Sequence, residues 1–111
     1  MRYMMFVVTD PEAEEYVGSE DTIEEWVAEN DRKGRRVFGD RLRPAEDATT
    51  VRVRGGETII TDGRFAETKE WIAGFDILEC KDLDEAIEVA AAYPMARFGR
   101  LEVRPFWPFE E

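Results

Sequence analysis

The chain has 111 residues, of which 43% are hydrophobic and 12% aromatic, so we expect one folded domain rather than a disordered chain. Its 15 basic and 26 acidic residues give a net charge of −11, which disfavours nucleic acid and anionic membrane surfaces as partners. No apolar run approaches the roughly 18 residues of a membrane span, and we expect a cytoplasmic protein.

The N-terminal part of the sequence predicts a strand followed by a helix. Residues 2–8 are rich in aromatic and β-branched side chains, and they predict a strand rather than a signal peptide because no small-residue cleavage site follows. Asp21 and Glu24 have the spacing of a capping box at the start of a helix. Gly34 is typical of the position just after a helix C-terminus, so the helix is expected to end there.

A short strand and a hairpin follow. Residues 35–42 predict a strand in which Gly39 indicates a bulge or a close backbone approach. Residues 49–62 contain two β-rich runs around Gly55 and Gly56, which is the pattern of a β-hairpin with a two-residue turn.

Alternation along this hairpin predicts two different sides. The side expected to face the core carries Val51, Val53, Ile60 and, at its far end, Asp62. The opposite side carries Arg52, Arg54, Glu57 and Ile59, and we expect both arginines to pair with Glu57. Asp62 is therefore expected to leave the hairpin on the buried side.

The C-terminal part predicts a strand, a second helix and a last strand. The strand covers residues 72–80, and the helix is expected to begin at Asp82, with Glu85 at the capping-box position, and to end before Pro94. The expected apolar stripe of this helix is Leu83, Ala86, Ile87, Ala90 and Ala91. The last strand starts at Arg100, and it is followed by a proline-containing tail that carries Phe106, Trp107 and Phe109.

This order of elements predicts an α+β fold of the ferredoxin-like type, with an antiparallel sheet and two helices on one face. The other face of the sheet also carries apolar side chains, at Tyr3 or Met4 and at Phe75 or Asp76 depending on register. An apolar face without a covering layer needs a partner, so we expect a homodimer with the two sheets face to face.

The absence of some residue types excludes several chemistries. The chain has no histidine, so a Ser-His-Asp triad, a Cys-His pair and imidazole metal ligation are impossible. The single cysteine, Cys80, lies among apolar residues and is expected to be buried and inert. No acidic cluster has the spacing of an EF-hand loop, so we expect neither a metal nor a cofactor.

The segment TDGRFAETKE, residues 61–70, closely resembles the TDGPFAETKE signature of the YCII-related family, in its DGPF-type branch. The resemblance extends over roughly nine-tenths of the chain, from the first strand through the hairpin to the closing helix and strand. It implies a dimeric α/β barrel, which agrees with the order of elements. Members are often encoded beside extracytoplasmic-function sigma factors, and most have no established activity.

Two departures from the family pattern affect what can be carried over. Arg64 stands where the signature has proline, so a stiff turn gains a flexible charge. Some members are thought to use a His-Asp pair, and one relative eliminates chloride from a chlorinated hydroxyquinol. This chain has no histidine for that mechanism.

The match to the signature selects Asp62 as a candidate catalytic acid or base. The accompanying candidate ligand-binding residues are Gly63, Arg64, Phe65, Glu67, Thr68 and Lys69. Asp62 and Gly63 are also ordinary turn residues, so a purely structural role is the first alternative, and an edge that binds another protein is the second. Asp40, at the end of the second strand, is expected to be a surface carboxylate paired with Arg41 or Arg43.

Two functions remain open from the sequence. In the first, a homodimer binds a small aromatic or anionic organic molecule and processes it by acid-base chemistry without histidine. In the second, the protein is a non-catalytic accessory or regulatory module of a sigma-factor system. A concave pocket beside Asp62 and Lys69 favours the first.

Overall fold

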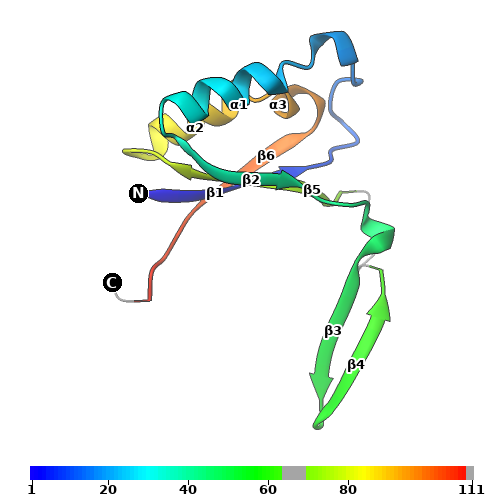
Figure 1. Cartoon of the computed structure of the whole chain (residues 1–111). Helices are drawn as coiled ribbons and strands as arrows, with labels where there is room; N and C mark the ends of the chain where they lie inside the picture. The colour runs from blue at the N-terminus through cyan, green and yellow to red at the C-terminus, as the bar shows by residue number, and fades with distance from the viewer. Residues whose placement is uncertain (64–69, 110–111) are drawn as a thin grey trace.

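The computed structural model describes residues 1–63 and 70–109, and it contains one main sheet, a separate hairpin and a layer of helices (Figure 1). The strands are β1 (Arg2–Val8), β2 (Arg36–Arg41), β3 (Thr49–Arg54), β4 (Glu57–Asp62), β5 (Ile72–Glu79) and β6 (Arg100–Pro105). The α-helices are α1 (Ile23–Arg32), α2 (Leu83–Ala91) and α3 (Met95–Phe98). Short 3-10 turns occur at Gly18–Glu20 and Ala45–Asp47.

The main sheet has the strand order β2-β5-β1-β6, and every neighbouring pair is antiparallel. With the hairpin set aside, the chain runs strand, helix, strand, strand, helix, strand, and the first and third of these strands lie in the centre. This is the topology of a ferredoxin-like fold, as the sequence predicts. The two crossovers place α1 and α2 on the same face of the sheet (Figure 1).

The core lies between that face and the helices. Tyr3 and Met5 of β1 pack there with Leu78 of β5 and with Trp26 of α1. The indole Nε1 of Trp26 donates a hydrogen bond of 2.8 Å to the carbonyl oxygen of Val89. This bond fixes α1 against α2, because a buried indole N–H without an acceptor costs free energy.

The two helices begin differently. At α2 the prediction is confirmed, since Asp82 accepts a hydrogen bond from the Glu85 backbone N–H at 2.9 Å. At α1 the capping-box prediction is wrong, because the N-cap is Thr22 and its side chain makes no capping bond. The Asp21 carboxylate instead accepts the Ile23 backbone N–H, two residues further on, at 3.2 Å.

The predicted stripe of α2 is correct only in part. Ala86 and Ala90 are buried, and Val89 joins them against the sheet. Leu83 and Ile87 are exposed. The buried side of the helix is therefore rotated toward Val89 and away from Leu83 and Ile87. Cys80 is buried, as predicted.

The hairpin β3–β4 forms a sheet of its own and projects away from the main sheet (Figure 1). Its register is the predicted one, with Val51 opposite Ile60 and Arg54 opposite Glu57. The predicted burial is wrong, because Val51 and Ile60 are exposed and Asp62 is exposed too. Alternation along a hairpin identifies its apolar side, but it does not show whether the same chain covers that side.

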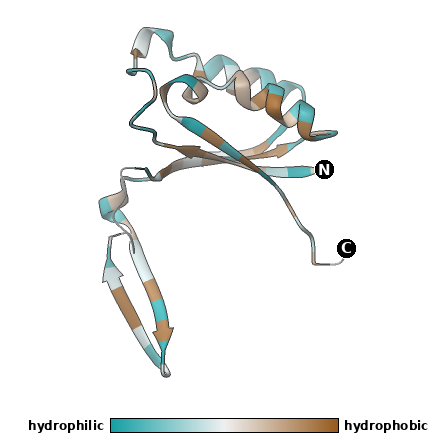
Figure 2. Cartoon of the chain, turned by 180° about the vertical axis from the view of Figure 1, so that it is seen from behind, coloured by the Kyte–Doolittle hydropathy of each residue, from teal (hydrophilic) through white to brown (hydrophobic). Residues whose placement is uncertain are grey.

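The face of the main sheet away from the helices is open. The register assigns Met4, Phe6, Phe75 and Ile77 to it, and these side chains are half-buried. Phe38 on the edge strand β2 lies on the same face, with its ring centroid 5.8 Å from that of Phe75. Figure 2 shows hydrophobic segments along the sheet and on both strands of the hairpin.

Among the described residues, none of the helices has the length and apolarity to cross a membrane.

A side chain at Gly39, on β2, would collide with the neighbouring strand β5. A Cβ atom there comes within 2.0 Å of Asp76 Oδ1 and 2.6 Å of the Phe75 carbonyl oxygen. The sequence prediction of a close approach at Gly39 is thus confirmed, and its cause is the Asp76 carboxylate.

We expect Gly39→Ala to lower the free energy of unfolding by about 1–3 kcal/mol, the usual cost of overpacking. Urea denaturation monitored by circular dichroism measures the change. Gly18→Ala is the matched control, because a Cβ atom at Gly18 meets nothing within 4 Å. Equal stability of the two variants contradicts the prediction.

Candidate functional site

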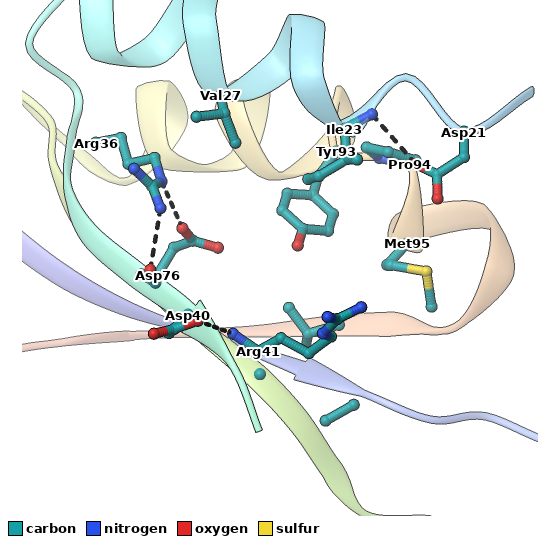
Figure 3. Close-up of a pocket in the computed structure, with 14 residues that line it drawn as sticks. Asp21, Ile23, Val27, Arg36, Asp40, Arg41, Asp76, Tyr93, Pro94 and Met95 are labelled. Atoms are coloured by element: carbon teal, nitrogen blue, oxygen red, sulfur yellow. Dashed lines mark hydrogen bonds and ion pairs between the residues drawn. The ribbon is translucent and has the colours of Figure 1, made fainter. Parts of the chain in front are cut away.

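A cavity of about 500 Å³ lies between the helix layer and the edge of the main sheet (Figure 3). The sheet contributes residues of β2 and β5, and the opposite wall comes from α1 and from the turn between α2 and α3. Its polar or charged side chains are those of Asp21, Arg36, Asp40, Arg41, Asp76 and Tyr93. This volume lies in the range of pockets that hold small organic ligands.

Asp76 is the buried acid of this cavity. It stands in the middle of β5, opposite Met5 on one neighbouring strand and Gly39 on the other, so its side chain points to the helix side of the sheet. Only 5% of the residue is exposed. The missing side chain at Gly39 leaves the space that the carboxylate occupies.

Arg36 holds one oxygen of this carboxylate. Its Nε donates to Asp76 Oδ1 at 2.9 Å, its Nη2 donates to the Gly39 carbonyl oxygen at 3.1 Å, and its Nη1 reaches Asp31 at 3.2 Å. The guanidinium is thus held on three sides. Within the described part of the chain no group donates a hydrogen bond to the second oxygen, Oδ2.

Burial raises the pKa of Asp76 above that of an ordinary aspartate, and the more distant charge of Asp31 adds to the effect. The hydrogen bond and the positive charge of Arg36 lower this pKa, but they do not cancel the cost of removing the carboxylate from water. A carboxylate with a raised pKa is better suited to proton transfer near neutral pH than an exposed one.

Tyr93 faces the same cavity from the opposite wall (Figure 3). Its ring packs edge-on against Trp26, with centroids 4.6 Å apart, and this contact fixes its orientation. Burial, together with the negative charges of Asp76 and Asp21, raises the pKa of Tyr93 to about 12. The phenol therefore stays protonated at neutral pH, and its hydroxyl makes no hydrogen bond to any described residue.

Arg41 supplies a cation at the mouth of the cavity. It is exposed, and Figure 3 shows its side chain extending toward Met95. Its guanidinium forms no ion pair with the residues that the structure describes. Asp40 is a surface carboxylate, as predicted, but it accepts a hydrogen bond from the Arg41 backbone N–H at 2.9 Å rather than pairing with a guanidinium.

The third acid of the cavity, Asp21, is already engaged. It accepts hydrogen bonds from the Tyr16 hydroxyl at 2.5 Å and from the Ile23 backbone N–H at 3.2 Å. The groups left to contact a ligand are one oxygen of Asp76, the hydroxyl of Tyr93 and the guanidinium of Arg41, with Asp40 as an exposed carboxylate beside them. Together they provide an acid or base, a neutral donor and a cation.

The structure separates the sequence-predicted site from this cavity. Asp62 ends β4 and is exposed, and Gly63, with φ of 85°, follows in the left-handed conformation that favours glycine. Neither residue lines the cavity. The remaining candidates, Arg64, Phe65, Glu67, Thr68 and Lys69, lie outside the described residues. Among those that are described, no group of three or more potential metal ligands occurs.

Sequence reasoning did not select Asp76, Arg36 or Tyr93. The available signal was an acid in the middle of the apolar run FDIL, because an acid in a buried strand requires a partner. Alternation alone did not decide whether Asp76 or Phe75 faces the helices. The partner Arg36 is 40 residues away in the sequence, and only the pairing of β2 with β5 brings the two together.

Two comparisons with known proteins bear on the identity of the chain. Residues 1–110 match the model of the YCII-related domain. A 67-residue segment is 48% identical to an uncharacterised protein of Rhizobium meliloti (strain 1021), and the match covers 59% of this chain and 54% of that protein. With a family model that spans nearly the whole sequence and a fold of the expected topology, the chain belongs to the YCII-related family.

Proposed function

We propose that this protein is a homodimer that binds a small organic anion in the cavity lined by Asp76, Tyr93 and Arg41. The observation that carries the proposal is the buried Asp76 carboxylate, which has one oxygen bound to Arg36 and the other free of described donors in a cavity of about 500 Å³. A largely buried acid with a raised pKa and one oxygen open to a cavity is typical of functional sites.

Three acids and two arginines line the cavity, and Arg41 is the group among them that favours an anionic ligand. Arg36 is occupied by Asp76, Asp31 and Gly39, whereas Arg41 has no ion-pair partner among the described residues. A carboxylate of the ligand accepts hydrogen bonds from Arg41 in this arrangement, and Tyr93 donates to a second polar group. The apolar lining, which includes Val7, Ile23 and Val27, suits an aromatic or aliphatic body.

Asp76 supports acid-base chemistry in a chain without histidine. Its raised pKa brings it closer to neutral pH, and its free oxygen lies on the cavity side (Figure 3). In this proposal Asp76 exchanges a proton with the bound molecule while Tyr93 donates a hydrogen bond to the charge that develops. Asp62 stays a second candidate for such a role through its match to the family signature.

The homodimer is proposed from the open face of the main sheet. Met4, Phe6, Phe75 and Ile77 on this face have no covering layer among the described residues. A second copy that packs its sheet against this face supplies that layer.

We also propose that the chain belongs to the DGPF-type branch of the family, because the segment 61–70 resembles the signature of that branch.

The second candidate function is a non-catalytic accessory or regulatory module, which the resemblance associates with an extracytoplasmic-function sigma factor. The exposed aromatic side chains of Trp107 and Phe109 in the tail favour it, because such residues are typical of protein contact sites. A thermal-shift screen of small aromatic and aliphatic carboxylates, each beside its neutral amide, distinguishes the candidates. Binding of a carboxylate favours the first, and a screen without any stabilising compound favours the second.

The first prediction concerns Arg41. We expect Arg41→Gln to weaken binding of a carboxylate found in this screen by about tenfold, since one charge-assisted contact is lost, and to leave binding of a neutral analogue unchanged. Isothermal titration calorimetry measures both affinities. The control is Arg43→Gln, which removes a nearby exposed arginine that pairs with Asp47 outside the cavity. Equal losses in the two variants contradict the assignment.

The second prediction concerns the pH dependence of stability. Because the folded pKa of Asp76 is raised, the unfolded chain releases this proton first as the pH rises. The stability of the wild type relative to Asp76→Asn should therefore fall from about pH 4, the unfolded pKa, up through the folded pKa. Urea denaturation of both proteins between pH 4 and 8 at constant ionic strength tests this. If the stability of the wild type relative to Asp76→Asn rises with pH, the pKa of Asp76 in the folded state is lowered rather than raised.

The third prediction concerns Asp62. Because this side chain is exposed, we expect Asp62→Asn to change the free energy of unfolding by less than about 0.5 kcal/mol. Thermal unfolding measures that change, and calorimetry with the same carboxylate measures binding. Normal stability with lost binding assigns Asp62 to the ligand site, whereas a large loss of stability shows a structural role that its exposure does not explain.

A further inference from the structure

We propose that the β3–β4 hairpin, residues 49–62, is a dimerisation arm whose apolar side packs against the flank of a second copy of this chain. This inference rests on the homodimer part of the proposed function. It adds a contact surface that is separate from the open sheet face and from the ligand cavity.

The apolar side of the arm is exposed in the single chain. Val51, Val53 and Ile60 are 62%, 59% and 65% exposed, and the register places all three on one side. The arm shares no strand pairing with the main sheet. A two-stranded hairpin by itself is marginally stable in water, so this arm needs a packing partner to be well ordered.

The direction of the arm selects a second copy as that partner. Both views show the arm leaving the main sheet on the side away from the helices, which is also the side of the open face (Figures 1 and 2). Packed sheets lie about 10 Å apart, whereas a strand of six residues is roughly 20 Å long. A second copy that packs on the open face therefore lies beside the arm, and the arm is long enough to extend past the sheet of that second copy.

Charge favours the same contact. Each chain carries a net charge of −11, so two copies repel each other over most of their surface. The arm carries two arginines, Arg52 and Arg54, and two acids, Glu57 and Asp62, and its net charge is therefore zero. A neutral segment with an apolar side approaches a like-charged copy with less repulsion than the acidic segments of the chain do.

The arm can be altered without disturbing the core of the domain. The core cluster consists of described residues from β1, β5, α1 and α2 with the adjoining Cys80, and it includes no residue of the arm. The experiment compares the full chain with a variant that combines Val51→Ser, Val53→Ser and Ile60→Ser. The matched control combines Arg54→Ser with Glu57→Ser, which alters the other side of the arm and keeps the net charge.

Sedimentation velocity over a dilution series measures the dimer dissociation constant, and circular dichroism verifies the fold. We expect the triple-serine variant to raise this constant by about a hundredfold or more, because three buried aliphatic side chains per arm are lost, and we expect little change in the control. A wild-type dimer whose dissociation constant is unchanged by the triple substitution overturns the arm alone. A wild-type chain that is monomeric at micromolar concentration overturns the proposed homodimer as well. Ligand binding in the cavity is tested separately, by the carboxylate screen.

Thiol labelling of a Val53→Cys variant gives an independent measurement. The native Cys80 is buried, so labelling reports on position 53. We expect slow labelling at concentrations where the protein is dimeric and labelling at the rate of a free thiol after dilution. Fast labelling at both concentrations shows that the arm is uncovered in the dimer and overturns the inference.

Discussion

The buried carboxylate of Asp76 is the constraint on which the arrangement around the cavity depends. It stands on the helix side of β5, where water is largely excluded, so it requires a charged partner and space. Arg36 supplies the partner, and the absent side chain of Gly39 supplies the space. Both come from the edge strand β2, and the pairing of β2 with β5 is therefore necessary for the site and not only for the sheet.

A buried ion pair is a weak source of stability, because the desolvation of two charges offsets much of their attraction. In this cavity the pair is also incomplete, since Arg36 binds one carboxylate oxygen and the other faces the cavity. The ion pair is better explained by the carboxylate oxygen that it directs into the cavity than by the stability that it contributes. It holds an acid of raised pKa in a defined orientation, opposite a phenol that stays protonated at neutral pH.

The lack of histidine limits the chemistry that such a site performs. A proton acceptor near neutral pH then requires an acid or amine whose pKa is shifted by its surroundings. Burial is the largest cause of that shift for Asp76, and the negative charge of Asp31 adds to it. The proposed association of two copies involves the open sheet face and the arm, and the residues of these surfaces differ from those of the cavity.

The sequence by itself determined the six strands, the helices α1 and α2 and their order, whereas the short helix α3 was expected to be a loop. Strand alternation, the Asp82 cap and the Gly55-Gly56 turn depend on neighbours within a few residues, so they were predictable, and so was the hairpin register. The family also followed from a continuous segment. The start of α1 was predicted wrongly because Asp21 accepts the Ile23 backbone N–H, a local pattern that competes with a capping box.

Only the tertiary structure decided which sides of these elements are buried. Val51 and Ile60 form an apolar side as predicted, yet the chain itself provides nothing among its described residues to cover them. The site depended on tertiary structure for the same reason, because Arg36, Asp76 and Tyr93 come from three separate segments that meet through strand pairing and helix packing. Periodicity shows which residues share a side, whereas burial depends on contacts between residues far apart in the sequence, and those contacts exist only in the folded chain.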